Sequence, residues 1–120
     1  MLELEMGMSQ DEADDFSYRG VNEGSKLGGA SELWLEGNLV SDSKFGISGF
    51  AVLPAGRRVR VPFDSTPGRY LEAAIAADFW SATEYDDYKV WRRKLRFNFS
   101  SVFRYPAYKN NGFSVRCVKD

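Results

Sequence analysis

The sequence predicts an α+β domain made of short strands, long ordered loops and one or two helices. Three observations predict this class: an alternating pattern in the C-terminal third, a glycine-rich central segment, and a helix-start signal near the N-terminal end. The chain has 120 residues, of which 43% are hydrophobic and 15% aromatic. This length and composition suit a single domain over residues 1–120 with a buried core.

The helix-start signal is the pair Ser9 and Glu12. A serine followed three residues later by a glutamate forms a capping box, in which each side chain accepts a hydrogen bond from the other residue's backbone N–H. We therefore expect helical structure within residues 2–15, with a short helix that continues from Ser9 to about Phe16. Acidic residues in its first turn suit the positive end of the helix dipole.

The central segment, residues 17–49, contains seven glycines. This composition favours a loop with brief extended pieces rather than regular helix or sheet. We expect Trp34, Leu35 and Leu39 to hold the loop against the core. A long ordered loop in a compact domain is uncommon and usually has a function.

Short strands are expected on both sides of an alanine-rich stretch. The predicted strands are residues 49–54, 57–63, 79–83 and 112–118, and residues 70–77 fit either a helical turn or a loop. In the last strand Cys117 shares one side with Phe113 and Val115, and we expect this cysteine to be buried. Because it is the single cysteine, any disulfide would join two chains.

From Tyr88 onward the side chains alternate with the period of a β-strand. One face carries Trp91, Arg93 and Leu95, and the other carries Arg92, Lys94 and Arg96. Three adjacent cations without partners would be too costly to bury. The second face is therefore either exposed or paired with acidic residues.

Charge is distributed unevenly along the chain. Residues 1–56 contain ten acidic and three basic residues, whereas residues 57–120 contain thirteen basic and seven acidic ones. Either the two halves neutralise each other in the fold, or the basic half marks an interaction surface. The overall pI of about 5.5 argues against a nucleic-acid partner.

The composition disfavours catalysis and metal binding. Histidine is absent and there is one cysteine, so the usual zinc sites, Ser-His-Asp triads and Cys-His dyads cannot form. The acids Glu84, Asp86 and Asp87 lie close together but outside any calcium-binding loop pattern, which favours a polar turn. We expect no enzyme activity, no metal and no cofactor. We also expect no membrane span, because no apolar run approaches the required length of about 20 residues.

Four ordered blocks resemble the Fibrobacter succinogenes major paralogous domain: residues 18–27, 49–56, 79–85 and 111–120. The resemblance implies a C-type lectin-like fold, related to formylglycine-generating enzymes whose reactive cysteines or metal site this chain lacks. The family's usual N-terminal cysteine and Gly-Trp-His block are missing, which implies a shortened form or a fragment. The calcium-dependent sugar motifs of animal C-type lectins are also absent.

The resemblance extends to variable proteins of diversity-generating retroelements, in which a reverse transcriptase rewrites codons near the 3′ end of the gene. By this resemblance the fixed scaffold is Trp91, Arg93, Leu95, Ser100, Val102, Arg104 and Lys109. The expected ligand-binding surface is Asp87, Tyr88, Lys89, Arg92, Lys94, Arg96, Phe97, Phe99, Ser101, Phe103, Tyr105, Pro106, Ala107 and Tyr108.

The function implied is an adhesin-like or receptor-like module at a cell surface or virion, with a protein or surface glycan as its ligand. Arginine and large aromatic residues, which are frequent in the expected surface, dominate binding hot spots. The alternative is a structural or cell-envelope domain of the same family with no diversified site.

Overall fold

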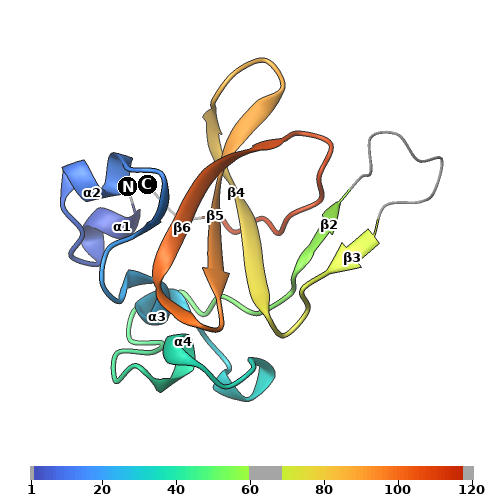
Figure 1. Cartoon of the computed structure of the whole chain (residues 1–120). Helices are drawn as coiled ribbons and strands as arrows, with labels where there is room; N and C mark the ends of the chain where they lie inside the picture. The colour runs from blue at the N-terminus through green and yellow to red at the C-terminus, as the bar shows by residue number, and fades with distance from the viewer. Residues whose placement is uncertain (1, 60–68, 118–120) are drawn as a thin grey trace.

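The computed structural model describes residues 2–59 and 69–117, which form an α+β arrangement as the sequence predicts. Within these residues an antiparallel four-stranded sheet has the order β1-β6-β5-β4 (Figure 1). Its strands are β1 Ser17–Arg19, β4 Ala76–Glu84, β5 Lys89–Arg96 and β6 Phe99–Tyr108. A separate two-stranded sheet pairs β2 Arg57–Val59 with β3 Arg69–Leu71.

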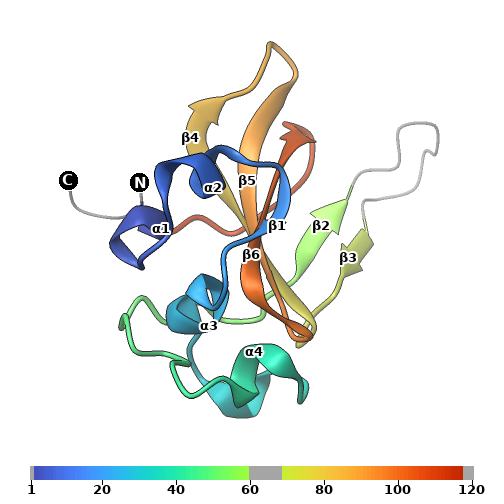
Figure 2. The same cartoon turned by 60° about the vertical axis from the view of Figure 1, so that its left-hand side comes forward.

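Short helices cover one side of the four-stranded sheet (Figure 2). They are α1 Leu2–Glu5, α2 Gln10–Asp14, α3 Glu23–Leu27, the 3-10 helix η1 Ser31–Leu33, and α4 Asn38–Ser41. The capping box that starts α2 is confirmed, because Ser9 Oγ accepts from the Glu12 N–H and Glu12 accepts from the Ser9 N–H. The helix ends at Asp14, earlier than the expected Phe16, which is exposed.

The alternation predicted from Tyr88 onward is confirmed in β5 and continues into β6. Cross-strand pairs place Ala77 beside Leu95 on one side of the sheet, and Asp78 beside Lys94 and Phe103 on the other. We call the side of Leu95 the inner face and the side of Lys94 the outer face. The inner face carries the core, because Leu95 and Val102 are fully buried against the helical segment.

The core joins the inner face to the central segment. Its buried members are Leu27, Trp34, Leu39, Val52, Ala77, Leu95 and Val102. Burying a leucine or valine side chain stabilises the fold by about 1.5–3 kcal/mol. Trp34 and Leu39 are buried as expected, and the Trp34 indole donates to the Gly29 carbonyl at 3.0 Å. The expectation for Leu35 is wrong, since this side chain is 47% exposed.

The prediction that residues 17–49 lack regular helix is wrong, since α3, η1 and α4 lie within them. The physical reason is a close approach that only glycine allows. A Cβ on Gly24 in α3 would lie 2.5 Å from the Ser101 carbonyl oxygen of β6. Gly24 therefore allows a short helix to pack closely against the sheet. From composition alone, the same glycine predicts a loop.

Two predicted strands are not formed. In residues 49–54 only Val52 makes an isolated bridge, with Gly28, and in the described part of residues 112–118 only Gly112 and Ser114 do. Ser114 adds to the β4 edge, donating to Asp78 O at 3.0 Å and accepting from Trp80 N at 3.2 Å. Beyond this point the chain leaves the edge, so Cys117 is exposed and its predicted burial is wrong.

The remaining predictions concern residues 57–83, which contain β2, β3 and most of β4. The predicted strand 79–83 is confirmed within β4. The predicted strand 57–63 is confirmed at 57–59, and residues 60–63 lie outside the described residues. Residues 70–77 are neither a helical turn nor a plain loop, because β3 runs through Leu71 and β4 begins at Ala76 after a turn.

Candidate functional site

The outer face brings together half of the expected ligand-binding residues. Cross-strand pairing sets Arg92 beside Tyr105, Lys94 beside Phe103, and Arg96 beside Phe99. Ser101 lies two positions from both Phe99 and Phe103 along β6, so it lies on the same face. Seven of the expected residues therefore share one side of two neighbouring strands.

The three cations of this face are paired with acids, which decides between the alternatives left open by the sequence. Arg92 Nη1 lies 2.9 Å from Asp78 Oδ1, and Lys94 Nζ lies 2.8 Å from Glu72 Oε2. Arg96 also contacts Glu72, at 3.4 Å. Lys94 is buried and Asp78 is fully buried. These pairs form a fixed frame within the sheet rather than a row of solvated charges.

The two acids respond differently to this environment. Burial raises the pKa of Asp78, although Lys94 and Arg92 oppose the rise, and burial also lowers the pKa of Arg92. For Glu72 burial would raise the pKa, but the hydrogen bond and charge of Lys94, followed by Arg57 and Arg96, lower it. Glu72 is therefore well satisfied as a carboxylate, whereas the Asp78–Arg92 pair bears a desolvation cost.

Next to this frame stands a series of contacting rings, which we call the aromatic row: Tyr18, Phe99, Phe103 and Tyr105. The Tyr18 ring is stacked on Phe99 at 3.9 Å and lies 5.1 Å from Phe103. Phe103 and Tyr105 are stacked at 6.0 Å. Phe99 is 38% and Tyr105 48% exposed. The row thus offers several aromatic faces to a ligand on one side of the sheet.

Tyr18 enters this row from β1 and was not among the expected surface residues. It stands beside Phe103 through the β1–β6 register. Burial raises the pKa of Tyr18, so its phenol stays protonated and can donate a hydrogen bond. The sequence offered no local signal for it, because the β1–β6 pairing joins residues more than 80 positions apart.

A second group of expected residues lies at the far end of β5 and β6. Asp86 Oδ1 accepts from the backbone N–H groups of Tyr88 and Lys89, both at 2.8 Å, and thereby shapes the β4–β5 turn. Tyr88 and Tyr108 are strongly exposed. Lys89 Nζ lies 4.9 Å from the centre of the Tyr108 ring. Asp87 is exposed in the same turn.

Three expected residues are not placed on this surface. Ala107 is buried, with 8% exposure. Pro106 pairs with Trp91, so it faces the inner side. Phe97 lies in the β5–β6 turn and packs against the core.

The inner face contains a charged cluster that the expected surface does not include. Arg19 Nη2 lies 2.8 Å from Glu3 Oε1, and Arg93 Nε donates to the same oxygen. Arg104 lies over the Trp91 ring at 3.6 Å and donates to the Asp14 carbonyl at 2.6 Å. These contacts attach α1 and α2 to the sheet. Trp91, Arg93 and Arg104 therefore take part in the packing of the helices on the sheet.

Neither a group of metal ligands nor a membrane-spanning helix is found in the part of the chain that the structure describes. Among the described residues no three His, Cys, Asp or Glu side chains gather closely enough to hold a metal ion. In the same residues no helix is long and apolar enough to cross a membrane.

Comparison with known families gives a match over nearly the whole chain. The family model described as Fibrobacter succinogenes major domain matches residues 1–119. The chain belongs to this family. Curated proteins gave no match to this chain. Solved structures gave none either.

Proposed function

We propose that this protein is a ligand-binding module that uses the outer face around the aromatic row to bind a protein or a surface glycan. The observation that carries the proposal is the row itself, four contacting rings on one accessible sheet face. Large aromatic side chains bury much area at little cost in side-chain entropy and dominate binding hot spots. An adhesin-like or receptor-like role at a cell surface or virion fits such a surface.

The ion pairs behind the row support this proposal because they hold it in place. The Arg92 guanidinium lies 5.2 Å from the centre of the Phe103 ring while its Nη1 binds the buried Asp78. Lys94, the cross-strand neighbour of Phe103, is fixed by Glu72. A surface that is already ordered loses less freedom on binding, which favours affinity.

We further propose the C-type lectin-like fold that the sequence blocks imply. Its support is the mixture of a small antiparallel sheet with a long segment of short helices and loops. Binding surfaces in such folds are carried by a scaffold that tolerates change at its surface.

Diversification of the surface is part of the same proposal, as in the variable proteins of retroelements. The exposed residues Phe99 and Tyr105 alternate with buried Val102 and Arg104 along β6. Replacement at exposed positions leaves the core intact. Arg92 and Lys94 are ion-paired, so we expect fewer different residues at these two positions among isolates.

The test of diversification is to compare codons 87–108 among isolates and to search for a neighbouring template repeat. An invariant segment without a repeat contradicts diversification.

A non-diversified structural or cell-envelope domain is the second candidate. The observation that favours it is the internal use of Arg92, Lys94 and Arg96, whose charges are met by Asp78 and Glu72. On this alternative the sheet face is a stable frame without a ligand. Invariant codons together with a failed ligand search would support it.

The binding experiment begins with a random-peptide display library and a glycan array applied to the immobilised protein. Ligands recovered with the wild type are then measured on the double variant Phe99→Ala, Tyr105→Ala. We expect at least about tenfold weaker binding, since two hot-spot rings are removed. Tyr70→Ala is the matched control, because Tyr70 is 82% exposed on β3, which belongs to the separate two-stranded sheet. Unchanged affinity in the double variant contradicts the proposal.

A further inference from the structure

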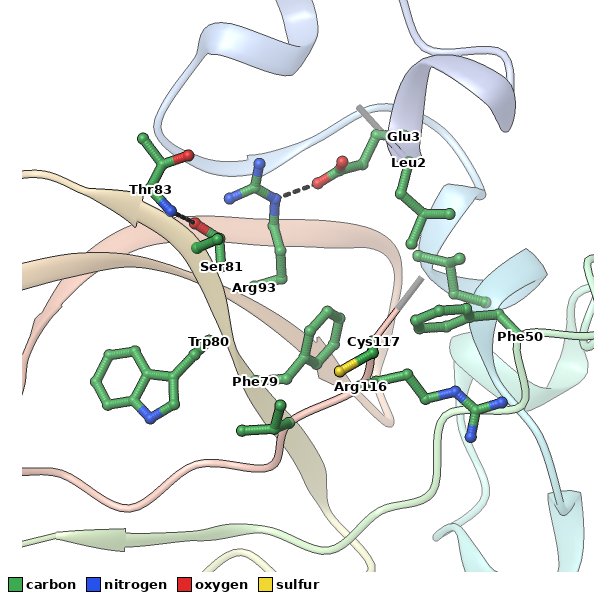
Figure 3. A pocket seen from close by; sticks show the side chains of 13 residues that line it. Leu2, Glu3, Phe50, Phe79, Trp80, Ser81, Thr83, Arg93, Arg116 and Cys117 are labelled. Atoms are coloured by element: carbon green, nitrogen blue, oxygen red, sulfur yellow. Dashed lines mark hydrogen bonds and ion pairs between the residues drawn. The ribbon is translucent and has the colours of Figure 1, made fainter. Parts of the chain in front are cut away.

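The inner face contains a pocket of about 620 Å³ that the proposed function does not use (Figure 3). Its size falls within the range of about 300–1,000 Å³ that is usual for small-molecule sites. It lies between α1, the second half of β4 and the segment after Ser114. Its lining includes Glu3, Phe50, Phe79, Arg93, Val115 and Cys117.

The body of the pocket is apolar. The rings of Phe50 and Phe79 lie 6.4 Å apart and both line it, together with Leu2 and Leu27. An apolar wall of this kind binds hydrocarbon through the hydrophobic effect, at about 0.8 kcal/mol for each buried CH₂ group.

One end of the pocket is charged. Figure 3 shows the Arg93 side chain reaching toward Glu3 at one end of the cavity. Arg93 Nε donates to Glu3, and Arg93 Nη1 is buried with no hydrogen-bond partner in the described part of the chain. A buried guanidinium with an unused donor is costly, and an acceptor brought by a ligand would relieve that cost.

The charge balance at this end is positive. Glu3 shares its single negative charge between Arg19 and Arg93. Burial would raise the pKa of Glu3, but the charge of Arg93 and the hydrogen bonds from Arg19 and Arg93 lower it, so the carboxylate is ionised. At the opposite side Arg116 lies 5.1 Å from the centre of the Phe50 ring. Among these residues the Glu3 carboxylate thus meets two guanidiniums at this end, and a third guanidinium lies on the opposite side.

We propose that this pocket binds an apolar carboxylic acid, such as a medium-chain fatty acid. The carboxylate accepts a hydrogen bond from the unused Nη1 donor of Arg93, and the hydrocarbon chain packs on Phe79 and Phe50. Charge complementarity selects an anion over a cation, and the apolar wall selects a chain over a small ion. This site lies on the inner face and does not depend on the aromatic row.

The experiment follows alkylation of Cys117 by iodoacetamide, because this single cysteine is exposed and lines the pocket. Octanoate is expected to slow the reaction in a saturable manner. Octanol, which lacks the charge, is expected to need about tenfold higher concentration for equal protection, since a hydrogen bond between charged groups is lost. Acetate, which lacks the chain, is expected to need more than about a hundredfold.

Matched variants separate the site from general effects. Val115 and Val21 are both 74% exposed, and Val115 alone of the two lines the pocket. Val115→Asp is expected to weaken octanoate protection about tenfold through like-charge repulsion, whereas Val21→Asp leaves it unchanged. Arg93→Lys keeps the charge beside Glu3 but removes the Nη donors, so it is expected to weaken octanoate binding. Circular dichroism checks that this variant is folded.

Three outcomes overturn the proposal: octanoate fails to protect Cys117, octanol protects as well as octanoate, or Val21→Asp weakens protection as much as Val115→Asp. None of them bears on the aromatic row, whose ligands are measured with Phe99→Ala and Tyr105→Ala.

Discussion

Arginine side chains make different kinds of contact on the two faces of the sheet. On the inner face Arg93 binds Glu3 of α1, and Arg104 holds the Asp14 carbonyl of α2 while it covers Trp91. On the outer face Arg92, one position along β5, binds Asp78 of the neighbouring strand. Inner charges connect separate elements, whereas outer charges connect the sheet to itself and to Glu72.

A strand rich in basic residues therefore need not present a basic surface. The alternating cations of β5 suggest an interaction surface in the sequence, yet Lys94 is buried and Arg92 is ion-paired. Apart from Arg96, whose side chain is 37% exposed, the accessible large side chains of the outer face are the aromatic ones Phe99 and Tyr105. We therefore assign the frame to the cations and the contact with a ligand to the rings.

The largest effect is expected from Glu3→Gln on the inner face. The change leaves two buried guanidiniums, Arg19 and Arg93, without a carboxylate, and breaking a buried pair typically costs about 3–5 kcal/mol. Urea denaturation measures the loss. Glu5→Gln on the same helix is the control, because Glu5 is exposed, and a similar loss in both variants would contradict the role of Glu3.

On the outer face the Asp78–Arg92 pair is expected to behave differently. Asp78→Leu alone should cost about 3 kcal/mol, because Arg92 is left buried without its partner. Adding Arg92→Met should restore most of that loss, since burial raises the pKa of Asp78 and lowers that of Arg92. A double variant as unstable as the single one would show that the pair itself stabilises the fold.

Glu72→Gln should have an intermediate effect of about 1–2 kcal/mol. Glu72 contacts Arg57, Lys94 and Arg96, but its side chain and that of Arg96 reach solvent, so screening reduces each pair. The loss should shrink when salt is raised from 0.05 M to about 1 M, where the Debye length falls to roughly 3 Å. A loss that does not change with salt would exclude this explanation.

The pH dependence should differ in sign between the faces. The folded-state pKa of Glu3 is lowered from 4.5, so its contribution to stability is present above that pH and is lost as the pH falls below it. The pKa of Asp78 is raised from 3.8, so its contribution is present below that pH and is lost as the pH rises through the folded value. Melting temperatures between pH 7 and 3 check both.

In Glu3→Gln the stability deficit relative to wild type should narrow as the pH falls. Asp78→Asn removes the carboxyl group that binds a proton in the folded state. The stability of the wild type relative to this variant should therefore increase as the pH falls. A parallel response of the two variants to pH would contradict the assignment of opposite shifts.

The smallest effect on stability is expected in the aromatic row. Phe99→Ala and Tyr105→Ala should each cost less than about 1 kcal/mol, because both rings are substantially exposed. Leu95→Ala on the inner face should cost about 2–5 kcal/mol, since Leu95 is fully buried. Thermal unfolding gives both values. Equal losses would mean that the row belongs to the core.

Local pattern made part of this fold predictable. The period-two alternation identifies β5 and the faces on which Leu95 and Lys94 lie, because strand geometry fixes that period. The Ser9–Glu12 box identifies α2, because both hydrogen bonds lie within four residues. The expected surface residues Phe99, Phe103 and Tyr105 share one face for the same reason.

Tertiary contacts set the parts that sequence reasoning missed. The Glu3–Arg93 contact spans 90 positions, and nothing near Glu3 indicates that partner. Gly24 sits in a helix because β6 leaves no room for a side chain, which composition cannot show. The segment that holds Cys117 touches the β4 edge at Ser114 and then departs, so its alternating pattern does not produce a strand.

Binding of a ligand at the aromatic row is tested by NMR chemical-shift mapping, with a ligand recovered from the display library or the glycan array. With ¹⁵N-labelled protein, we expect the largest shifts at Tyr18, Phe99, Phe103 and Tyr105. Shifts should stay small at Tyr70 on β3 and at Glu3 and Arg93 on the inner face. Largest shifts at those latter residues, with the aromatic row unaffected, would contradict binding at the row.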